Sequence, residues 1–293
     1  MRITNQMMTN GLLQHAQKTM NDVNITQEQI ASGKRFQTPS ENPTDASSSL
    51  QLKSALTVSQ GYQESAALIQ DWMSETDFCL SQLVDIATDA QKLVQGGIND
   101  TMDDKSRATM ATELTEMINQ AIDLGNTRFQ GNYIFSGVRL DSPSFELTET
   151  GTLNYLGISK DMKRGIGQSS EVTMNINGDQ AIAPLIQAMI KARDNLQANN
   201  TTDLPDSLDE LESAMDTLVV KQTANGARMR QVETGISNME DADINLQAIL
   251  NQKENTDLLE AAAVLKSQET AYQIVLEVGN RAISALNLFD YMQ

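Results

Sequence analysis

Apolar residues recur every three or four positions through several long stretches of the chain, and this spacing lets an α-helix present one face to a partner helix. We call each such series a seam. The first seam ends at Gly96-Gly97, a helix-stopping pair, and is preceded by Asn42, Pro43 and Asp45, which together mark a helix start. Its members are Leu52, Ala55, Ser59, Tyr62, Ala66, Ile69, Met73, Thr76, Leu80, Leu83, Ala87, Ala90 and Val94.

A second seam begins behind Pro205-Asp206-Ser207. It consists of Leu208, Leu211, Met215, Leu218, Gln222, Asn225, Met229, Val232, Ile236, Met239, Asp243, Leu246 and Leu250. Its polar members have two interpretations: they fix the register of the helix pair at some cost in stability, or they mark solvent-facing stretches.

Two further seams lie at the ends of the chain. The C-terminal seam comprises Leu258, Ala261, Leu265, Gln268, Tyr272, Val275, Gly279, Ala282, Leu286 and Phe289. The N-terminal seam is thinner, ends near Ser32-Gly33, and comprises Leu13, Ala16, Met20, Val23, Gln27 and Ile30. A shorter amphipathic stretch around Met110, Leu114, Met117, Ala121 and Leu124 fills the space between the first seam and Gly131.

The pattern changes between about Gly131 and Gly178, where glycines separate short runs of alternating apolar and polar residues. The alternating positions are Phe145/Leu147, Leu153/Tyr155 and Val172/Met174/Ile176, and Asn177-Gly178 is expected to form a turn. This region is predicted to be a small β-rich insertion.

The predicted fold is therefore mainly α: a long helical hairpin or coiled-coil bundle whose N- and C-terminal helices pair, with the β-rich insertion at its tip. Three domains are expected. Residues 1–44 with 255–293 form a terminal coiled coil, residues 45–132 with 182–254 a helical bundle, and residues 133–181 a small outer domain.

The terminal seams contain Ala, Gln and Gly, so they bury less apolar area than a seam of large side chains, each of which is worth about 1.5–3 kcal/mol. Isolated helices are marginal in water, and we expect the terminal domain to be disordered until assembly covers it. The residues expected to form this assembly and chaperone interface are Leu13, Met20, Val23, Ile30, Leu258, Leu265, Tyr272, Val275, Ala282, Leu286 and Phe289.

Composition narrows the partners. Aromatic residues make up only 4% of the chain, against 15 methionines, which favours helical packing. The formal net charge of −18 repels nucleic acid and anionic membranes. We expect a protein that does not cross a membrane and has no cleaved secretory signal, because the chain has no long apolar run and its first residues lack an apolar core.

Few residues of the sequence suggest a catalytic, metal-binding or cofactor-binding site. Cys79 is the single cysteine and His15 the single histidine, so neither an internal disulfide nor a Cys/His metal cluster is expected. The acidic pairs Asp103-Asp104 and Asp241/Asp243 do not match a calcium loop, and Gly165-Ile166-Gly167 is not a nucleotide fingerprint. No catalytic, cofactor or metal site is predicted, and an enzyme is not expected.

Three groups of motifs resemble the flagellin family, and the resemblance spans nearly the whole chain. Near the N-terminus they are Met1-Arg2-Ile3-Thr4, Ala31-Ser32-Gly33-Lys34-Arg35-Phe36 and Pro39-Ser40-Glu41-Asn42-Pro43. The most specific is Gly131-Asn132-Tyr133-Ile134-Phe135-Ser136-Gly137, at the entrance to the insertion. The C-terminal motifs are Glu260-Ala261-Ala262-Ala263, Gln268-Glu269-Thr270-Ala271-Tyr272-Gln273 and Leu286-Asn287-Leu288-Phe289-Asp290-Tyr291-Met292.

Within that family the motifs are similar to those of proteins that join hook and filament. The resemblance implies an extracellular ring of subunits between a hook-side junction protein and flagellin, with export through the flagellar type III channel. It also implies a cytosolic export chaperone on the C-terminal helix.

Two alternatives stay open. Flagellin itself shares the hairpin plan, although the motifs around Glu41-Asn42-Pro43 and Tyr133-Ile134-Phe135-Ser136-Gly137 argue against it. An unrelated coiled-coil adaptor or secretion translocator would carry similar seams but would have no reason to carry the family motifs.

Overall fold

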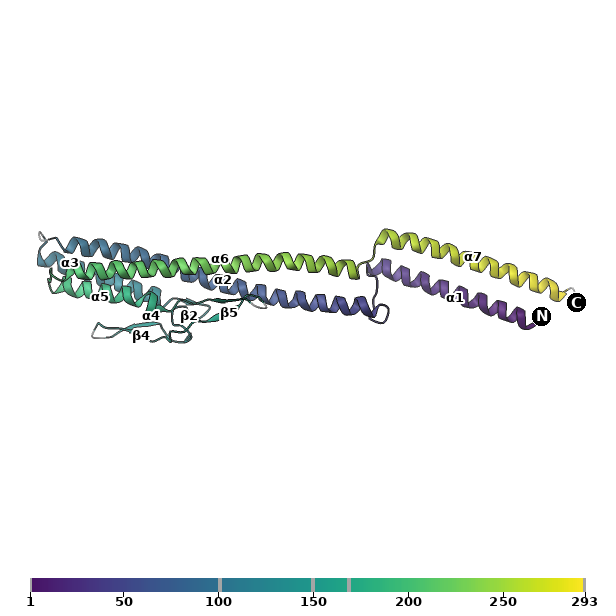
Figure 1. Ribbon diagram of the computed structural model, residues 1–293, viewed down its shortest axis with the longest axis horizontal. Coiled ribbons are helices and arrows are strands. Elements are labelled where there is room, and N and C mark those ends of the chain that lie inside the picture. The colour runs from purple at the N-terminus through teal and green to yellow at the C-terminus, as the bar shows by residue number, and fades with distance from the viewer. Residues whose placement is uncertain (1, 100–101, 149–150, 168–169, 292–293) are drawn as a thin grey trace. The chain divides into compact units, whose positions relative to one another are not determined.

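The computed structural model describes residues 2–99, 102–148, 151–167 and 170–291, without the side chains of residues 2–6, 8 and 282–291. The described part contains seven helices and three two-stranded hairpins (Figure 1), so the expected mainly α fold is confirmed. The helices are α1 (Arg2–Ser32), α2 (Pro43–Gly97), α3 (Asp104–Gly125), α4 (Gly178–Ala181), α5 (Ala183–Gln197), α6 (Leu204–Glu254) and α7 (Leu258–Tyr291). The strands are β1 (Arg128–Phe129), β2 (Asn132–Tyr133), β3 (Phe145–Leu147), β4 (Leu153–Tyr155), β5 (Lys163–Gly165) and β6 (Glu171–Thr173).

The chain divides into two compact units. The terminal unit contains Met1–Thr57 and Ala242–Gln293, and the central unit contains Val58–Asp241. Helices α2 and α6 contribute to both units. The three-domain division of the sequence analysis stays a prediction.

The predicted helix start at Asn42 has a clear local cause, and the predicted end at Gly97 is observed. Asn42 accepts a hydrogen bond from the backbone N–H of Asp45 (3.1 Å), and α2 begins at Pro43, whose missing N–H needs no partner there. At the other end α2 stops at Gly97.

No described helix has the length and apolar character that a membrane span requires.

The core of the central unit is built on the two central seams. On α2 every seam position from Ala66 to Val94 is buried, as the spacing predicted. On α6 the seam is buried at Leu211, Leu218 and Val232. Helices α3 and α5 pack against each other and add Leu114, Ile118, Ile186 and Met189 to the same core. The central unit thus has the continuous apolar interior that a self-stable bundle needs.

Asn225 interrupts this apolar seam. Its side chain is buried, Nδ2 donates a hydrogen bond to the Met73 carbonyl oxygen on α2 (2.8 Å), and Oδ1 has no partner. Because this bond forms only when Asn225 faces Met73, the structure supports the register interpretation for this residue.

The three hairpins are antiparallel. Strands β1, β2 and β5 were not anticipated. Strands β3 and β4 lie where the alternation placed them, with Phe145 opposite Tyr155, and β6 contains Val172, the first position of the third predicted run. Met174 and Ile176 lie beyond the end of β6. Asn177-Gly178 is not a hairpin turn, because Asn177 precedes the first residue of α4.

The hairpins lie along the side of the central unit's helices (Figure 1), whereas the sequence analysis placed them at the tip. Phe145 of β3 explains this position. Its ring packs so closely on Gly125 of α3 and Gly178 of α4 that a Cβ at Gly125 would lie 2.6 Å from Cδ2. Two glycines therefore let the hairpin dock on the flank of the bundle.

The motif at the entrance to the insertion has a physical explanation. Gly131 and Gly137 both have positive φ angles (86° and 67°), which favour glycine. Between them Ile134, Phe135 and Ser136 are fully buried. A Cβ on Gly137 would lie 1.9 Å from the Ile158 carbonyl oxygen, so a side chain there would push the two segments apart.

Candidate assembly interface

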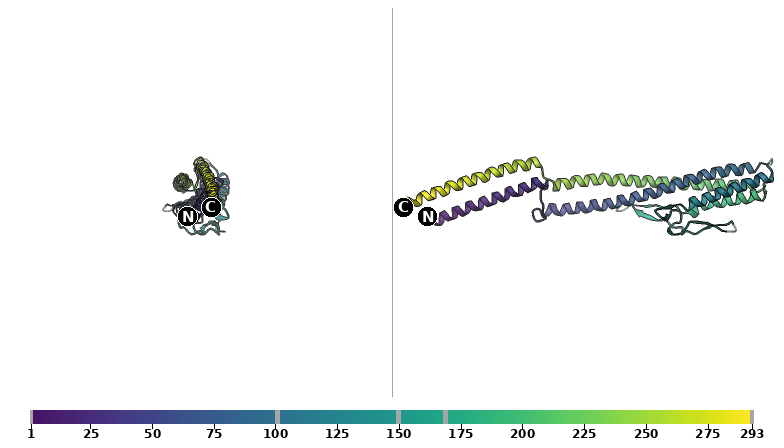
Figure 2. Two further views of the ribbon diagram at one scale, coloured as in Figure 1. Left: turned by 90° about the vertical axis from the view of Figure 1, so that its right-hand side faces the viewer. Right: turned by 180° about the vertical axis from the view of Figure 1, so that it is seen from behind.

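Helices α1 and α7 form the pair that the terminal seams predicted. They lie side by side in both figures and run in opposite directions, with the chain's two ends at the same end of the pair (Figures 1 and 2). The pairing of the terminal helices is thus confirmed.

The contact face of this pair is poor in large buried side chains. Val23 and Ala261 are buried, and Thr26 donates a hydrogen bond to Gln268 Oε1 across the pair (2.8 Å). At Gly279 the helices approach so closely that a Cβ would lie 2.6 Å from Leu12 Cδ2. Small and polar residues bury little apolar area, so this pair gains less stabilisation than the central unit.

Many apolar side chains of the pair instead face solvent. On α7 the exposed ones are Leu258, Leu259, Val264, Ile274, Leu276 and Val278. On α1 they are Met7, Leu13, Met20 and Ile25. A helix with apolar residues beyond its contact face normally ends up covered on several sides, and such exposed surface marks an interaction site.

The predicted interface residues fall into three groups. Val23 is buried, and Ile30, Leu265, Tyr272 and Val275 are half-buried within the α1–α7 pair. Leu13, Met20 and Leu258 are 57%, 44% and 54% exposed. Ala282, Leu286 and Phe289 lie outside the described side chains. Whether these residues bind a partner stays a prediction.

Sequence reasoning missed Leu259, which is 85% exposed, and the exposed residues Ile274 and Val278 further along α7. The C-terminal seam follows only one face of α7. The additional apolar residues on the other faces of this helix were the feature of the sequence that could have revealed them.

Where this pair meets the rest of the terminal unit, the α1–α2 link and the α6–α7 link run antiparallel and hydrogen bond to each other. Thr256 N–H donates to the Gly33 carbonyl oxygen (2.9 Å), and Arg35 N–H donates to the Glu254 carbonyl oxygen (2.7 Å). Lys34 and Asn255 form an isolated β-bridge. We call this crossing of the two links the joint. Gly33, with φ of 69°, makes the bend that ends α1.

Charged side chains surround the joint. Lys253 lies 2.8 Å from Asp45 Oδ1, and Glu254 is flanked by Lys34 (3.8 Å) and Lys53. The hydrogen bond from Lys253 lowers the pKa of the Asp45 carboxyl. Because the lysine side chain of each pair is about half exposed, these ion pairs contribute little to the free energy of folding. Their main effect is to favour one geometry of the two links.

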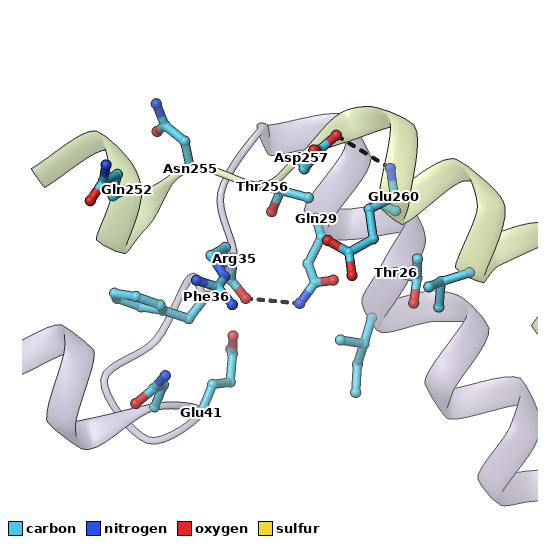
Figure 3. Close-up of a pocket in the computed structure, with 14 residues that line it drawn as sticks. Thr26, Gln29, Arg35, Phe36, Glu41, Gln252, Asn255, Thr256, Asp257 and Glu260 are labelled. Carbon is cyan, nitrogen blue, oxygen red and sulfur yellow. Dashed lines mark hydrogen bonds between the residues drawn. The ribbon is translucent and has the colours of Figure 1, made fainter. Parts of the chain in front are cut away.

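A cavity of about 820 Å³ opens beside the joint (Figure 3). The α1–α2 link supplies Arg35, Phe36 and Glu41, the α6–α7 link supplies Asp257, and the first turn of α7 supplies Glu260. Gln29 of α1 closes one side and donates a hydrogen bond from Nε2 to the Arg35 carbonyl oxygen (2.8 Å). Asp257 Oδ1 caps α7 by accepting from the N–H of Leu259 (2.9 Å).

Comparison with known proteins agrees with this architecture. The sequence model of the bacterial flagellin N-terminal helical region matches residues 3–139. This range includes the α1–α2 link and the Gly131–Gly137 motif. Flagellar hook-associated protein 3 of Escherichia coli K12 is 26% identical over 267 residues, covering 88% of this chain and 83% of that protein. The resemblance to the flagellin family is confirmed.

Solved structures show the same fold. FlgL of Bacillus cereus superposes with a TM-score of 0.61 at 24% identity, covering 69% of this chain and 99% of that one. The flagellar junction protein FlgL of Legionella pneumophila superposes with a TM-score of 0.57 at 14% identity, covering 63% of this chain and 98% of that one. Over the covered part, the chain therefore shares its fold with these proteins.

No group of three or more His, Cys, Asp or Glu residues in the described ranges is arranged to hold a metal ion. Cys79 is buried in the central unit, and burial raises the pKa of its thiol, so it is held in its less reactive protonated form.

Proposed function

We propose that this chain is a structural subunit of the bacterial flagellum that forms the junction ring between hook and filament and is required for filament attachment and growth. The observation that carries the proposal is the likeness to flagellar hook-associated protein 3 along 88% of the chain. The α1–α7 pair fits this role, because its outward apolar residues need neighbouring subunits to cover them.

The same likeness favours the junction over the alternatives. The relatives matched along the sequence carry the hook-associated name, and one structural neighbour is described as a junction protein. An unrelated adaptor would share long helices but not this pattern of relatives. Flagellin remains the runner-up, since the matching family model describes the N-terminal helical region of bacterial flagellin.

The finer assignments are also proposals. We infer that the ring contacts hook-associated protein 1 on the hook side and flagellin on the filament side, outside the cell. Export passes through the flagellar type III channel, and a cytosolic chaperone covers α7 before export. The exposed apolar side chains of α7 support this last step, because they would otherwise promote aggregation in the cytosol. The proposed role is mechanical and includes no catalysis or cofactor.

Immunolabelling of intact flagella tests this function by position. We expect antibody against the chain to mark a narrow band at the boundary between hook and filament in electron micrographs. Label along the whole filament would identify a flagellin instead. Absence from flagella would refute both and favour an adaptor.

The C-terminal seam can be tested directly. Replacing Leu286 and Phe289 by Ser removes large apolar groups from α7, so the central unit should stay folded while filaments detach. Circular dichroism of the purified chain and counts of filaments per cell measure the two effects. The matched control is Ser at the exposed central residues Val219 and Val220, which should leave filaments attached. Normal attachment in the Leu286/Phe289 variant would contradict the proposed interface.

A further inference from the structure

A second, smaller cavity of about 170 Å³ lies between the α1–α2 link and the first turns of α2. Its lining combines apolar side chains, among them Phe36, Pro39 and Leu50, with the charged side chains of Lys34 and Lys53. Phe36 also lines the larger cavity of Figure 3, so the two cavities are neighbours. Sites for drug-sized ligands measure roughly 300–1,000 Å³, so the size of this cavity suits a single side chain.

The Ser49 side chain lines this cavity with an unused hydroxyl group. Ser49 is only 2% exposed, and its Oγ has no hydrogen-bond partner. Nearby hydroxyls on α2 do have one: Ser48 donates to the Thr44 carbonyl oxygen (3.0 Å), and Thr57 donates to the Lys53 carbonyl oxygen (2.9 Å). Because a buried hydroxyl without a partner costs free energy, the Ser49 hydroxyl is available to a group that enters the cavity.

The charged groups of the lining leave an excess of positive charge. Among the described residues that line the cavity, Glu254 supplies the single carboxylate, against the ammonium groups of Lys34 and Lys53. Lys34 Nζ lies 3.8 Å from Glu254 Oε2, and Lys53 Nζ contacts Oε1 of the same carboxylate. Each ammonium carries three N–H donors, and both lysine side chains are about half exposed. Both lysines therefore keep donors for a second carboxylate.

An acidic side chain of a second copy matches these features. A buried carboxylate needs an opposite charge and hydrogen-bond donors, which the two ammonium groups and the Ser49 hydroxyl supply. The chain has 39 acidic residues against 21 basic ones and a formal net charge of −18, so a second copy carries the matching charge. Copies with this net charge repel one another, and a site that takes an acidic side chain offsets part of the repulsion where copies meet.

We propose that this small cavity binds an aspartate or glutamate side chain of a neighbouring copy, held by Lys34, Lys53 and the Ser49 hydroxyl. The inference rests on the proposed function, because copies become neighbours only in the junction ring. It makes Ser49 a determinant of the contact between copies and gives its hydroxyl no part in the stability of a single chain.

Zero-length cross-linking of isolated flagella tests the contact. A water-soluble carbodiimide joins an amine to a carboxylate only where the two groups touch. In flagella from cells that express a single version of this chain, we expect a product of twice the monomer mass. Mass spectrometry should locate its amide bond on Lys34 or Lys53. A bond from Lys53 to Glu254 within one chain, expected from their contact, shows that the reagent reaches the cavity.

Two alanine variants test the part played by Ser49. Losing one hydrogen bond to a charged group weakens a contact by roughly tenfold or more. Ser49→Ala should therefore lower the yield of the linked dimer. The matched control is Ser48→Ala, which removes a hydroxyl that already has a partner within the chain, and it should leave the yield unchanged. In thermal unfolding of the soluble chain, Ser49→Ala should leave the midpoint unchanged or raise it.

The outcomes separate this inference from the proposed function. A dimer yield that Ser49→Ala leaves unchanged, or a lower unfolding midpoint in that variant, would overturn the contact. Amide bonds from the two lysines only to Glu254 of the same chain, or to a different protein, would also overturn it. The junction role would still stand if antibody found the chain at the boundary. Absence of the chain from the boundary would refute the junction role and, with it, this contact.

Discussion

At the scale of single residues, conformational constraint and burial explain features that composition does not reveal. Gly137 has a positive φ, a backbone conformation that disfavours a side chain. The Ile158 carbonyl oxygen also occupies the space that a Cβ of residue 137 would need. Tyr155, behind the same segment, donates its hydroxyl proton to the Phe135 carbonyl oxygen (2.9 Å). Both residues fix the entrance of the insertion to the bundle.

We expect Gly137→Ala to lower the free energy of unfolding of the central unit by about 1–3 kcal/mol, because the new Cβ is both strained and blocked. Gly61→Ala is the matched control. No neighbouring atom lies within 4 Å of its Cβ position in α2, and it should stabilise by about 0.4–1 kcal/mol. Urea denaturation measures both. Equal effects of the two substitutions would contradict the role assigned to Gly137.

Burial, together with the charge of Asp179, raises the pKa of Tyr155 to about 12. The folded state therefore holds this proton more tightly than the unfolded state, whose value is near 10. Its stabilising contribution is complete below pH 10 and is lost as the pH rises toward 12.

Phenolate absorbance after a rapid pH jump measures this ionisation before the chain unfolds. The full chain should show a step near pH 12 that Tyr155→Phe removes and Tyr62→Phe retains. A step that survives in the Tyr155 variant would show that another tyrosine is responsible.

At the scale of helices and strands, the sequence predicted elements that have strong repeating seams and failed where the signal was short or weak. The buried series from Ala66 to Val94 repeats over many turns, so its face was unambiguous. On α1 the seam is thin, and Leu13 was chosen although Leu12 is the residue that meets Gly279. One position of difference rotates a helix by roughly 100°, and too few large residues were present to decide.

The prediction of the short strands failed for a different reason. Strands β1, β2 and β5 are only two or three residues long, and they depend on tertiary contacts rather than on alternation. The joint was only partly foreseen: Ser32-Gly33 marked the helix end, but hydrogen bonds between the two distant links leave no local pattern. The cavity and the exposed Leu259 beside it share this limitation.

The buried Asn225 side chain leads to a prediction about the pairing of α2 and α6. Replacing it by Leu removes a buried oxygen without a partner and should stabilise the central unit by about 1 kcal/mol. Asn225→Asp, of similar size, buries a charge and should destabilise by about 3 kcal/mol. Thermal unfolding compares the two. If the Leu variant is destabilised as much as the Asp variant, the hydrogen bond to Met73 contributes more than we infer.

At the scale of the whole molecule, the chain combines a unit with a continuous core and a unit that leaves many apolar side chains of its terminal helices exposed. The central unit buries its seams and holds its single cysteine inside. The terminal unit pairs α1 with α7 through small and polar residues and leaves apolar residues on both helices exposed. This difference is the physical basis for proposing that the terminal unit is completed by neighbouring subunits.

Amide hydrogen exchange on the soluble chain and on isolated flagella tests that claim most directly. In the soluble chain we expect α1 and α7 to exchange rapidly while the buried turns of α2 and α6 in the central unit are strongly protected. In flagella the same terminal amides should become protected. Strong protection of both terminal helices in the unassembled chain would contradict the account, because the pair would then be stable without neighbours.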